Sequence, residues 1–164
     1  MTNKKWIFPL VLIITLFAGF YFYNKYHVAP TINLQTLDLS DLQGDSVNME
    51  AFKGKKIILS FGASWCGNCI EEMKDLNSVK NSELQDVEVI IVSDEPLETV
   101  NSFKNRKNYP FTFLKMNKAF HEIGINAIPT SYIINTKLQV MKETVGYIDW
   151  KDPSTAQHFG KLME

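Results

Sequence analysis

Apolar residues follow two different patterns along the chain, and the first is an unbroken run close to the N-terminus. Residues 6–23 form an 18-residue segment without a charged side chain. As an α-helix, such a segment extends about 27 Å, close to the hydrocarbon thickness of a bilayer. Lys4 and Lys5 precede it, and aromatic residues stand at both of its ends. The pattern predicts a cytoplasmic N-terminus (1–5), a transmembrane signal anchor (6–23) and a domain outside the cytoplasm.

Two other interpretations of this segment stay open. A cleavable signal peptide has a shorter apolar region and a small-x-small cleavage site, which is not evident around Ala18 and Gly19. A buried helix of a soluble core would be unusual at a chain terminus with these flanks. A polar stretch with a proline, 24–31, follows, and we expect it to be a tether between the anchor and the domain.

The second pattern covers 32–164 and alternates short apolar runs with amphipathic segments. Residues 57–61 and 87–92 are nearly continuously apolar, which is typical of strands buried on both faces of a sheet. Further elements are expected at 34–52 (an edge hairpin and a one-turn connector), 96–108 (helix), 111–114 (strand), 118–123 (short helix), 131–134 and 138–145 (antiparallel strands) and 150–163 (closing helix). This order predicts an α/β domain with a helix-covered sheet.

The segment between the two buried strands predicts an amphipathic helix with one apolar stripe. The stripe is formed at helical spacing by Ile70, Met73, Leu76 and Val79. The charged residues left for the other faces are Glu71, Glu72, Lys74 and Asp75.

Composition narrows the possible partners. The chain has 164 residues, of which 45% are hydrophobic, and this is enough for a sizeable core without disulfide staples. Its formal net charge is -1, and no run of Lys or Arg is interleaved with aromatic residues. A nucleic-acid partner is therefore not expected, because binding to phosphate backbones requires a basic surface.

The two cysteines, Cys66 and Cys69, carry the candidate chemistry. They follow the strand 57–61 and stand at the beginning of the predicted helix. A sulfur at a helix N-terminus lies beside unpaired N–H groups and the positive end of the helix dipole, which favours the thiolate. Cys69 follows about one turn later, close enough to form an intramolecular disulfide. The placement predicts a redox dithiol in which Cys66 is the nucleophile and Cys69 resolves.

A structural disulfide and a zinc site are the alternatives for this pair. A staple stabilises most when it closes a long loop, and this one would span two residues. A zinc site would need two further ligands, yet His27, His121 and His158 are scattered without paired spacing. We therefore expect no metal.

Two segments of the chain resemble the thioredoxin superfamily. They are FGASWCGNCIEEM at 61–73 and GINAIPTSYIIN at 124–135. Within that superfamily the chain is most similar to the TlpA/ResA-like group of membrane-tethered thiol:disulfide oxidoreductases. The resemblance implies a thioredoxin fold over 32–164, with a central mixed β-sheet flanked by helices and an N-terminal β-hairpin extension. It also implies that this domain faces the periplasm or the cell exterior.

The resemblance implies an activity as well. Members of the group exchange dithiol for disulfide without a cofactor, and Cys66 and Cys69 would carry this exchange here. The implied protein is a reductase on the outer face of the bacterial cytoplasmic membrane, recharged by a transmembrane thiol donor. Its substrates would be protein disulfides such as those of apocytochrome c, in cytochrome c biogenesis. The reverse direction, oxidation of folding proteins, uses the same residues and stays open.

The resemblance assigns substrate binding to Ile128 and Pro129. In this family the matching proline has a cis peptide bond beside the dithiol, where adjacent backbone groups pair with an extended substrate. Taken alone, Pro129 is a strand-entry proline for which a trans bond is the expectation.

Glu72 is a candidate proton acceptor for Cys69. Thioredoxin has a buried aspartate six positions before its first active-site cysteine, but this chain has Ser60 there, and a hydroxyl is no base near neutral pH. Glu72, three residues after Cys69, matches a carboxylate that lies near the thiols in ResA-like proteins. On its chemistry alone, Glu72 is a solvated residue of the helix surface.

Trp65 and Asn68 are further positions of interest. Trp65 either shields the dithiol and offers an apolar docking edge, or is an ordinary core aromatic. Asn68 stands where thioredoxin has proline, and its N–H adds a donor near the sulfurs. The expected result is a more oxidising couple than that of thioredoxin.

Two rival functions use the same fold. A thiol peroxidase of the peroxiredoxin type has a Thr-x-x-Cys setting, whereas Ala63 occupies the threonine position before Cys66. A Cu(I)-binding metallochaperone would add a histidine such as His121 to the two thiolates. Copper chaperones on this fold typically space their cysteines by three residues, and two residues separate them here.

Overall fold

The computed structural model describes residues 4–163, and its elements alternate as the sequence predicts. The helices are α1 (Lys4–His27), α2 (Gly67–Val79), α3 (Leu97–Lys107) and α4 (Pro153–Leu162), with 3₁₀ turns at Leu34–Thr36, Met49–Phe52 and Phe120–Ile123. The strands are β1 (Leu39–Ser40), β2 (Ser46–Val47), β3 (Lys56–Phe61), β4 (Val87–Ser93), β5 (Thr112–Met116), β6 (Thr130–Ile134) and β7 (Val140–Val145).

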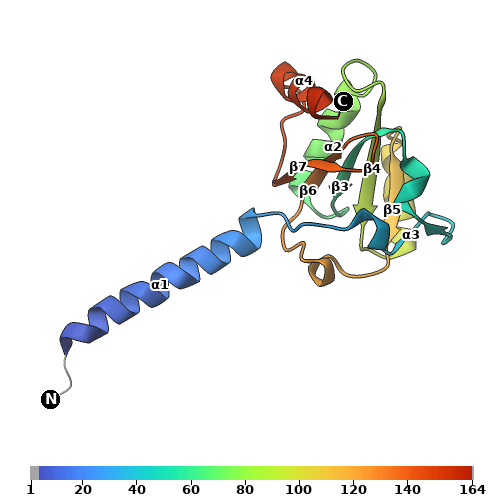
Figure 1. The fold of residues 1–164 in the computed structure, drawn as a ribbon. Coiled ribbons are helices and arrows are strands. Elements are labelled where there is room, and N and C mark those ends of the chain that lie inside the picture. Colours follow the sequence, from blue (N-terminus) through green and yellow to red (C-terminus); the bar gives the residue numbers. More distant parts are fainter. Residues whose placement is uncertain (1–3, 164) are drawn as a thin grey trace.

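Helix α1 projects away from the rest of the molecule as a single rod (Figure 1). Its segment Phe8–His27 is long and apolar enough to cross a membrane, and none of that segment is buried in the protein. The helix continues to His27, so the first four residues of the expected tether are helical. The next residues contact the domain, since the Tyr132 hydroxyl donates to the Pro30 carbonyl at 2.8 Å.

The seven strands form one mixed sheet in the order β2-β1-β5-β4-β3-β6-β7. The central strands β3, β4 and β5 are parallel, and β6 pairs antiparallel with β3. The hairpin β1–β2 extends the sheet at one edge and β7 closes the other. This is the thioredoxin-like arrangement that the resemblance implies.

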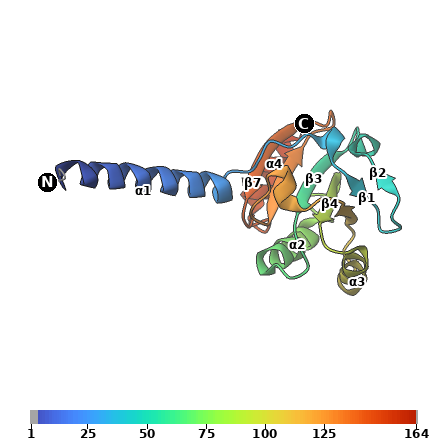
Figure 2. The same ribbon diagram turned by 90° about the horizontal axis from the view of Figure 1, so that it is seen from below.

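Both faces of the sheet are buried, which explains the continuous apolar runs. Ile58 contributes to a core cluster with α2, α3 and α4, whereas its neighbours Ile57 and Leu59 contribute to a second cluster beneath the 3₁₀ turns. Figure 2 shows α2 and α3 on the same side of the sheet. Successive strand residues point to opposite faces, so each face needs its own apolar set.

Several element boundaries differ from the expectations. The short helix expected at 118–123 is a 3₁₀ turn that ends at Gly124, whose φ of 83° is the left-handed conformation that glycine adopts easily. Trp150 lies before the closing helix, because Asp152 caps that helix and Pro153 occupies its first turn. Strand β5 begins at Thr112 and continues to Met116, two residues past the expected end.

Candidate active site

Cys66 is the N-cap residue of α2, at the end of the loop that leaves β3. Its sulfur accepts a hydrogen bond from the Cys69 N–H at 3.2 Å. Since this N–H belongs to the first turn of α2, it has no acceptor within the helix, and the sulfur takes that place. The same contact would stabilise a thiolate on Cys66 in the reduced protein.

Cys66 and Cys69 form a disulfide, and their Cα atoms lie 5.2 Å apart. Both residues are buried, Cys66 at 8% and Cys69 at 2% exposure. Gly62 allows α2 to approach this closely, because a Cβ at that position would lie 3.3 Å from the Cys69 sulfur. The strand end, the glycine and the helix start together hold the two sulfurs within bonding reach.

The loop before β6 completes the front of the disulfide. The Ile128–Pro129 peptide bond is cis, as the resemblance implies and contrary to the trans bond expected from the proline alone. The Ile128 carbonyl oxygen lies 3.9 Å from the Cys66 sulfur. Because an oxidised sulfur carries no proton, this is a van der Waals contact that places the Ile128 backbone beside the reacting bond.

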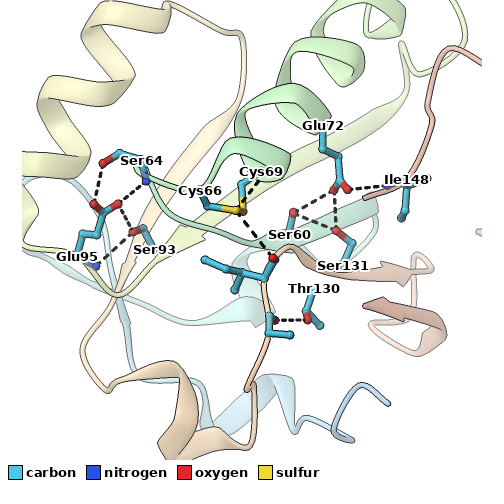
Figure 3. Close-up of a disulfide and its surroundings, with 12 residues drawn as sticks. Ser60, Ser64, Cys66, Cys69, Glu72, Ser93, Glu95, Thr130, Ser131 and Ile148 are labelled. Carbon is cyan, nitrogen blue, oxygen red and sulfur yellow. Dashed lines mark hydrogen bonds between the residues drawn. A yellow bond between two sulfur atoms is a disulfide. The ribbon is translucent and has the colours of Figure 1, made fainter. Parts of the chain in front are cut away.

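Glu72 is buried, at 1% exposure, and the expectation of a solvated surface residue is wrong. It lies one turn after Cys69 on α2, above Ser60 of β3 and Ser131 of β6, which face each other in the sheet. Its Oε1 accepts from the two serine hydroxyls at 3.4 and 3.0 Å, and its Oε2 accepts from the Ile148 N–H at 2.9 Å (Figure 3). The Glu72 carboxylate therefore lies on Ser60, the residue six positions before Cys66.

Burial changes the acidity of Glu72. Desolvation raises the pKa of this carboxyl, the hydrogen bonds from Ile148, Ser131 and Ser60 lower it, and the balance raises the pKa to about 7. A group with that pKa accepts and releases protons near neutral pH. Desolvation dominates because the neighbours that donate to Glu72 are themselves uncharged.

A second carboxylate, Glu95, lies on the other side of the disulfide (Figure 3). It accepts from the Ser64 N–H and the Ser64 hydroxyl, both at 2.7 Å, and from the Ser93 hydroxyl at 3.0 Å. These bonds fix the loop that delivers Cys66 to α2. Glu95 follows β4, which lies beside β3 in parallel, so both strands end at the same edge of the sheet.

Trp65 is 74% exposed, and this excludes the core-aromatic interpretation. It lines a groove of about 280 Å³ together with Ile128, His121 and the end of α1, where Lys25 and Tyr26 form part of the wall. His121 lies on this rim, and within residues 4–163 no three His, Cys, Asp or Glu side chains gather to hold a metal ion.

Comparison with known proteins identifies the family of this chain. Residues 27–143, more than half of its length, match the AhpC/TSA family. The chain belongs to the AhpC/TSA family. The thiol-disulfide oxidoreductase ResA of Bacillus thuringiensis (strain Al Hakam) is 26% identical over 159 residues, which cover 89% of this chain and 91% of the relative. ResA of Geobacillus thermodenitrificans (strain NG80-2) is 28% identical over 142 residues, covering 84% and 81%.

Solved structures agree on the fold of this family member. StoA from Bacillus subtilis superposes with a TM-score of 0.56 at 24% identity, covering 83% of this chain and 98% of StoA. The pneumococcal exposed lipoprotein thioredoxin Etrx1 gives 0.58 at 22% identity, covering 76% and 97%. With its disulfide between Cys66 and Cys69, the chain is a thioredoxin-like thiol-disulfide oxidoreductase.

The structure gathers most of the expected site residues around one disulfide: Cys66, Cys69, Trp65, Ile128 and Pro129 at its front and Glu72 behind it. Two carboxylates were not expected. Glu95 had a sequence signal, since it stands two residues after the end of β4, and the end of β4 lies beside the loop that follows β3. Asp75, which is also buried, had none, because it lies off the apolar stripe of α2.

Proposed function

We propose that this protein is a membrane-anchored, extracytoplasmic reductase of protein disulfides. The single observation that carries the proposal is the position of Cys66, at the N-terminus of α2, with its sulfur on the Cys69 N–H and beside the Ile128 carbonyl. In this position a thiolate is stabilised and a peptide backbone can pair with the loop next to it.

The reaction is a two-step exchange. The Cys66 thiolate attacks one sulfur of a substrate disulfide, forms a mixed disulfide and releases the first substrate sulfur as a thiolate. The Cys69 thiolate then attacks the Cys66 sulfur and releases the second substrate sulfur. The substrate gains two electrons and becomes a dithiol, and the protein is oxidised to the Cys66–Cys69 disulfide.

Glu72 serves the second step. Cys69 must lose its proton before it attacks, and it is 2% exposed, so the acceptor has to lie inside the protein. Glu72 lies one turn away on the same helix, with a pKa raised to about 7 by burial. It takes the Cys69 proton directly or through one water molecule. Its position above Ser60 supports this role, because it supplies the carboxylate that β3 lacks.

The N-terminal helix supports the proposed location. Phe8–His27 spans 20 residues, enough to cross a bilayer. The excess of lysine before the segment favours a cytoplasmic N-terminus. The groove beside the disulfide is lined by Lys25 and Tyr26 at the end of α1, so the site would open close to the membrane. That arrangement suits recharging by a thiol donor embedded in the membrane.

Insulin reduction tests the proposed activity. The full-length protein in detergent micelles, supplied with dithiothreitol, should precipitate insulin faster than dithiothreitol alone. The same protein with both thiols alkylated is the matched control. Equal rates for the active and the alkylated protein would refute the proposal.

Labelling of intact cells tests the proposed location. A membrane-impermeant maleimide should label Cys66 and Cys69 after mild reduction, without lysis. Labelling that requires lysis would place the domain in the cytoplasm.

A further inference from the structure

A second buried carboxylate lies on α2 one turn beyond Glu72. Asp75 is 1% exposed, although its sequence position suggests an exposed face. Its Oδ2 accepts from the Tyr147 hydroxyl, and its Oδ1 pairs with the Lys151 ammonium group. Both partners belong to residues 146–152, which connect β7 to α4. This loop therefore covers the flank of α2 that carries Glu72 and Asp75.

The same loop contacts the active site at two other points. Its first residue, Gly146, donates its N–H to the Pro129 carbonyl at 2.8 Å. Ile148, between the two residues that Asp75 holds, donates its N–H to Glu72. The loop thus connects the cis-proline, the buried acid and Asp75.

The electrostatics of the Asp75 contacts favour a fixed ion pair. Burial raises the pKa of Asp75, but the contacts with Lys151 and Tyr147 outweigh it, so the pKa of this carboxyl lies below its ordinary value. The hydrogen bond to Asp75 raises the pKa of Tyr147 to about 12. Asp75 is consequently ionised, and Tyr147 protonated, throughout the pH range in which thiols exchange.

We propose that Asp75 is a positioning residue for the exchange reaction, which holds Tyr147 and Lys151 so that the Ile148 N–H stays on the Glu72 carboxylate. This inference rests on the proposed function of Glu72. A backbone N–H on a carboxylate favours its charged form. If the loop moved away, Glu72 would lose this hydrogen bond and become hydrated. Because desolvation is the largest influence on its pKa, that pKa would fall towards its ordinary value, and the pH dependence of resolution by Cys69 would shift with it.

The groups that face Glu72 determine how its pKa responds to a movement of the loop. They are the neutral hydroxyls of Ser60 and Ser131, the Ile148 N–H and the Trp150 side chain. The charged groups of that flank are Lys151 and, buried on α2, Asp75. Loss of the Asp75 charge by itself would lower the pKa of Glu72, because a like charge disappears. Loosening of the loop would lower this pKa too, because it hydrates the carboxylate, so exchange of the Ile148 amide, and not the Glu72 midpoint, separates the two effects.

The test uses two variants that leave the charge of Asp75 in place, Tyr147→Phe and Lys151→Met. In the full-length protein in micelles, carboxyl carbon NMR gives the titration midpoint of Glu72, and hydrogen exchange gives the protection of the Ile148 amide. Both variants should exchange the Ile148 amide roughly tenfold faster, and Tyr147→Phe, which changes no charge, should lower the Glu72 midpoint, because the loosened loop admits water to the carboxylate. Glu71→Gln, which removes an exposed charge from the same helix, is the matched control and should change neither quantity.

Unchanged Ile148 exchange in both loop variants would overturn the proposal. A third variant, Asp75→Asn, separates the two mechanisms. It should speed exchange of the Ile148 amide if Asp75 positions the loop, whereas a lower midpoint with unchanged Ile148 exchange would assign its influence to charge alone and likewise overturn the proposal. Neither measurement depends on turnover, so both stay informative if the protein fails to reduce insulin.

Discussion

Glu72 and Glu95 stand on opposite sides of one disulfide and receive the same set of donors (Figure 3). Each carboxylate accepts from one backbone N–H and two serine hydroxyls. Glu72 is closed off from water, and burial raises its pKa to about 7, whereas Glu95 is only partly buried. The two carboxylates have equal numbers of donors but unequal burial. Glu72 can therefore exchange a proton near neutral pH, whereas Glu95 holds the loop before Cys66.

The two sides also serve different steps. Glu95 acts on the loop before Cys66 and so on the first attack. Glu72 lies one turn beyond Cys69 on α2, and we propose that it acts on resolution. A substitution on one side should therefore change one step and spare the other.

The largest loss of activity is expected from substitution of the two cysteines, and the two variants should stop the reaction at different steps. Cys66→Ser should lower insulin reduction by roughly a thousandfold or more, because it removes the nucleophile. Cys69→Ser should also stop turnover, but after the first step, so that a mixed disulfide with the substrate accumulates. Mass spectrometry of non-reduced digests checks both. A stable adduct on Cys69 in the Cys66→Ser variant would reverse the assigned roles.

The pH dependence of the free energy of unfolding tests the raised pKa of Glu72 independently of activity. Its pKa in the folded protein, about 7, lies above the value of 4.5 for an exposed glutamate. The folded state therefore binds its proton more tightly, and stability falls as pH rises from the lower value through the higher one. Urea unfolding of the domain should lose about 3 kcal/mol from this group across that window. Glu72→Gln should lack this loss, and an equal loss in the variant would assign it to other groups.

Loss of the Glu95 contacts should affect the first step. Glu95→Gln keeps the shape of the side chain but cannot accept from all three donors, so the loop before Cys66 loosens. We expect the attack by Cys66 to slow about tenfold and unfolding to become easier by about 1–2 kcal/mol. Rapid-quench measurement of mixed-disulfide formation checks this. A slower resolution step, with an unchanged attack, would contradict the division between the two sides.

The smallest effect is expected on the exposed rim. Trp65→Ala should raise the KM for a protein substrate about threefold to tenfold, because an exposed aromatic beside the disulfide offers docking area. Its effect on the free energy of unfolding should stay within about 0.5 kcal/mol. Tyr109→Ala, an aromatic substitution away from the groove, is the control. A KM equal to that of the unsubstituted protein would remove Trp65 from substrate binding.

The sequence predicts the front of this site better than its back. The strand before Cys66, the helix after it and the cis-proline loop all carry local signals or a family motif. The burial of Glu72 and Asp75 carries no such signal, because the apolar stripe of α2 describes only the face that packs on the sheet. The other flank is covered by residues 146–152, about seventy positions away, and contacts at such separation leave no periodicity in the helix.

The most direct measurement is the rate of resolution as a function of pH. Reduced protein is mixed with a disulfide peptide in a stopped-flow instrument, and decay of the mixed disulfide is followed from about pH 5 to about pH 9. We predict a rate that rises through a midpoint near 7 in the unsubstituted protein. In Glu72→Gln, resolution at neutral pH should be about a hundredfold slower and that midpoint should be absent. Superimposable rate profiles for the two proteins would contradict the account.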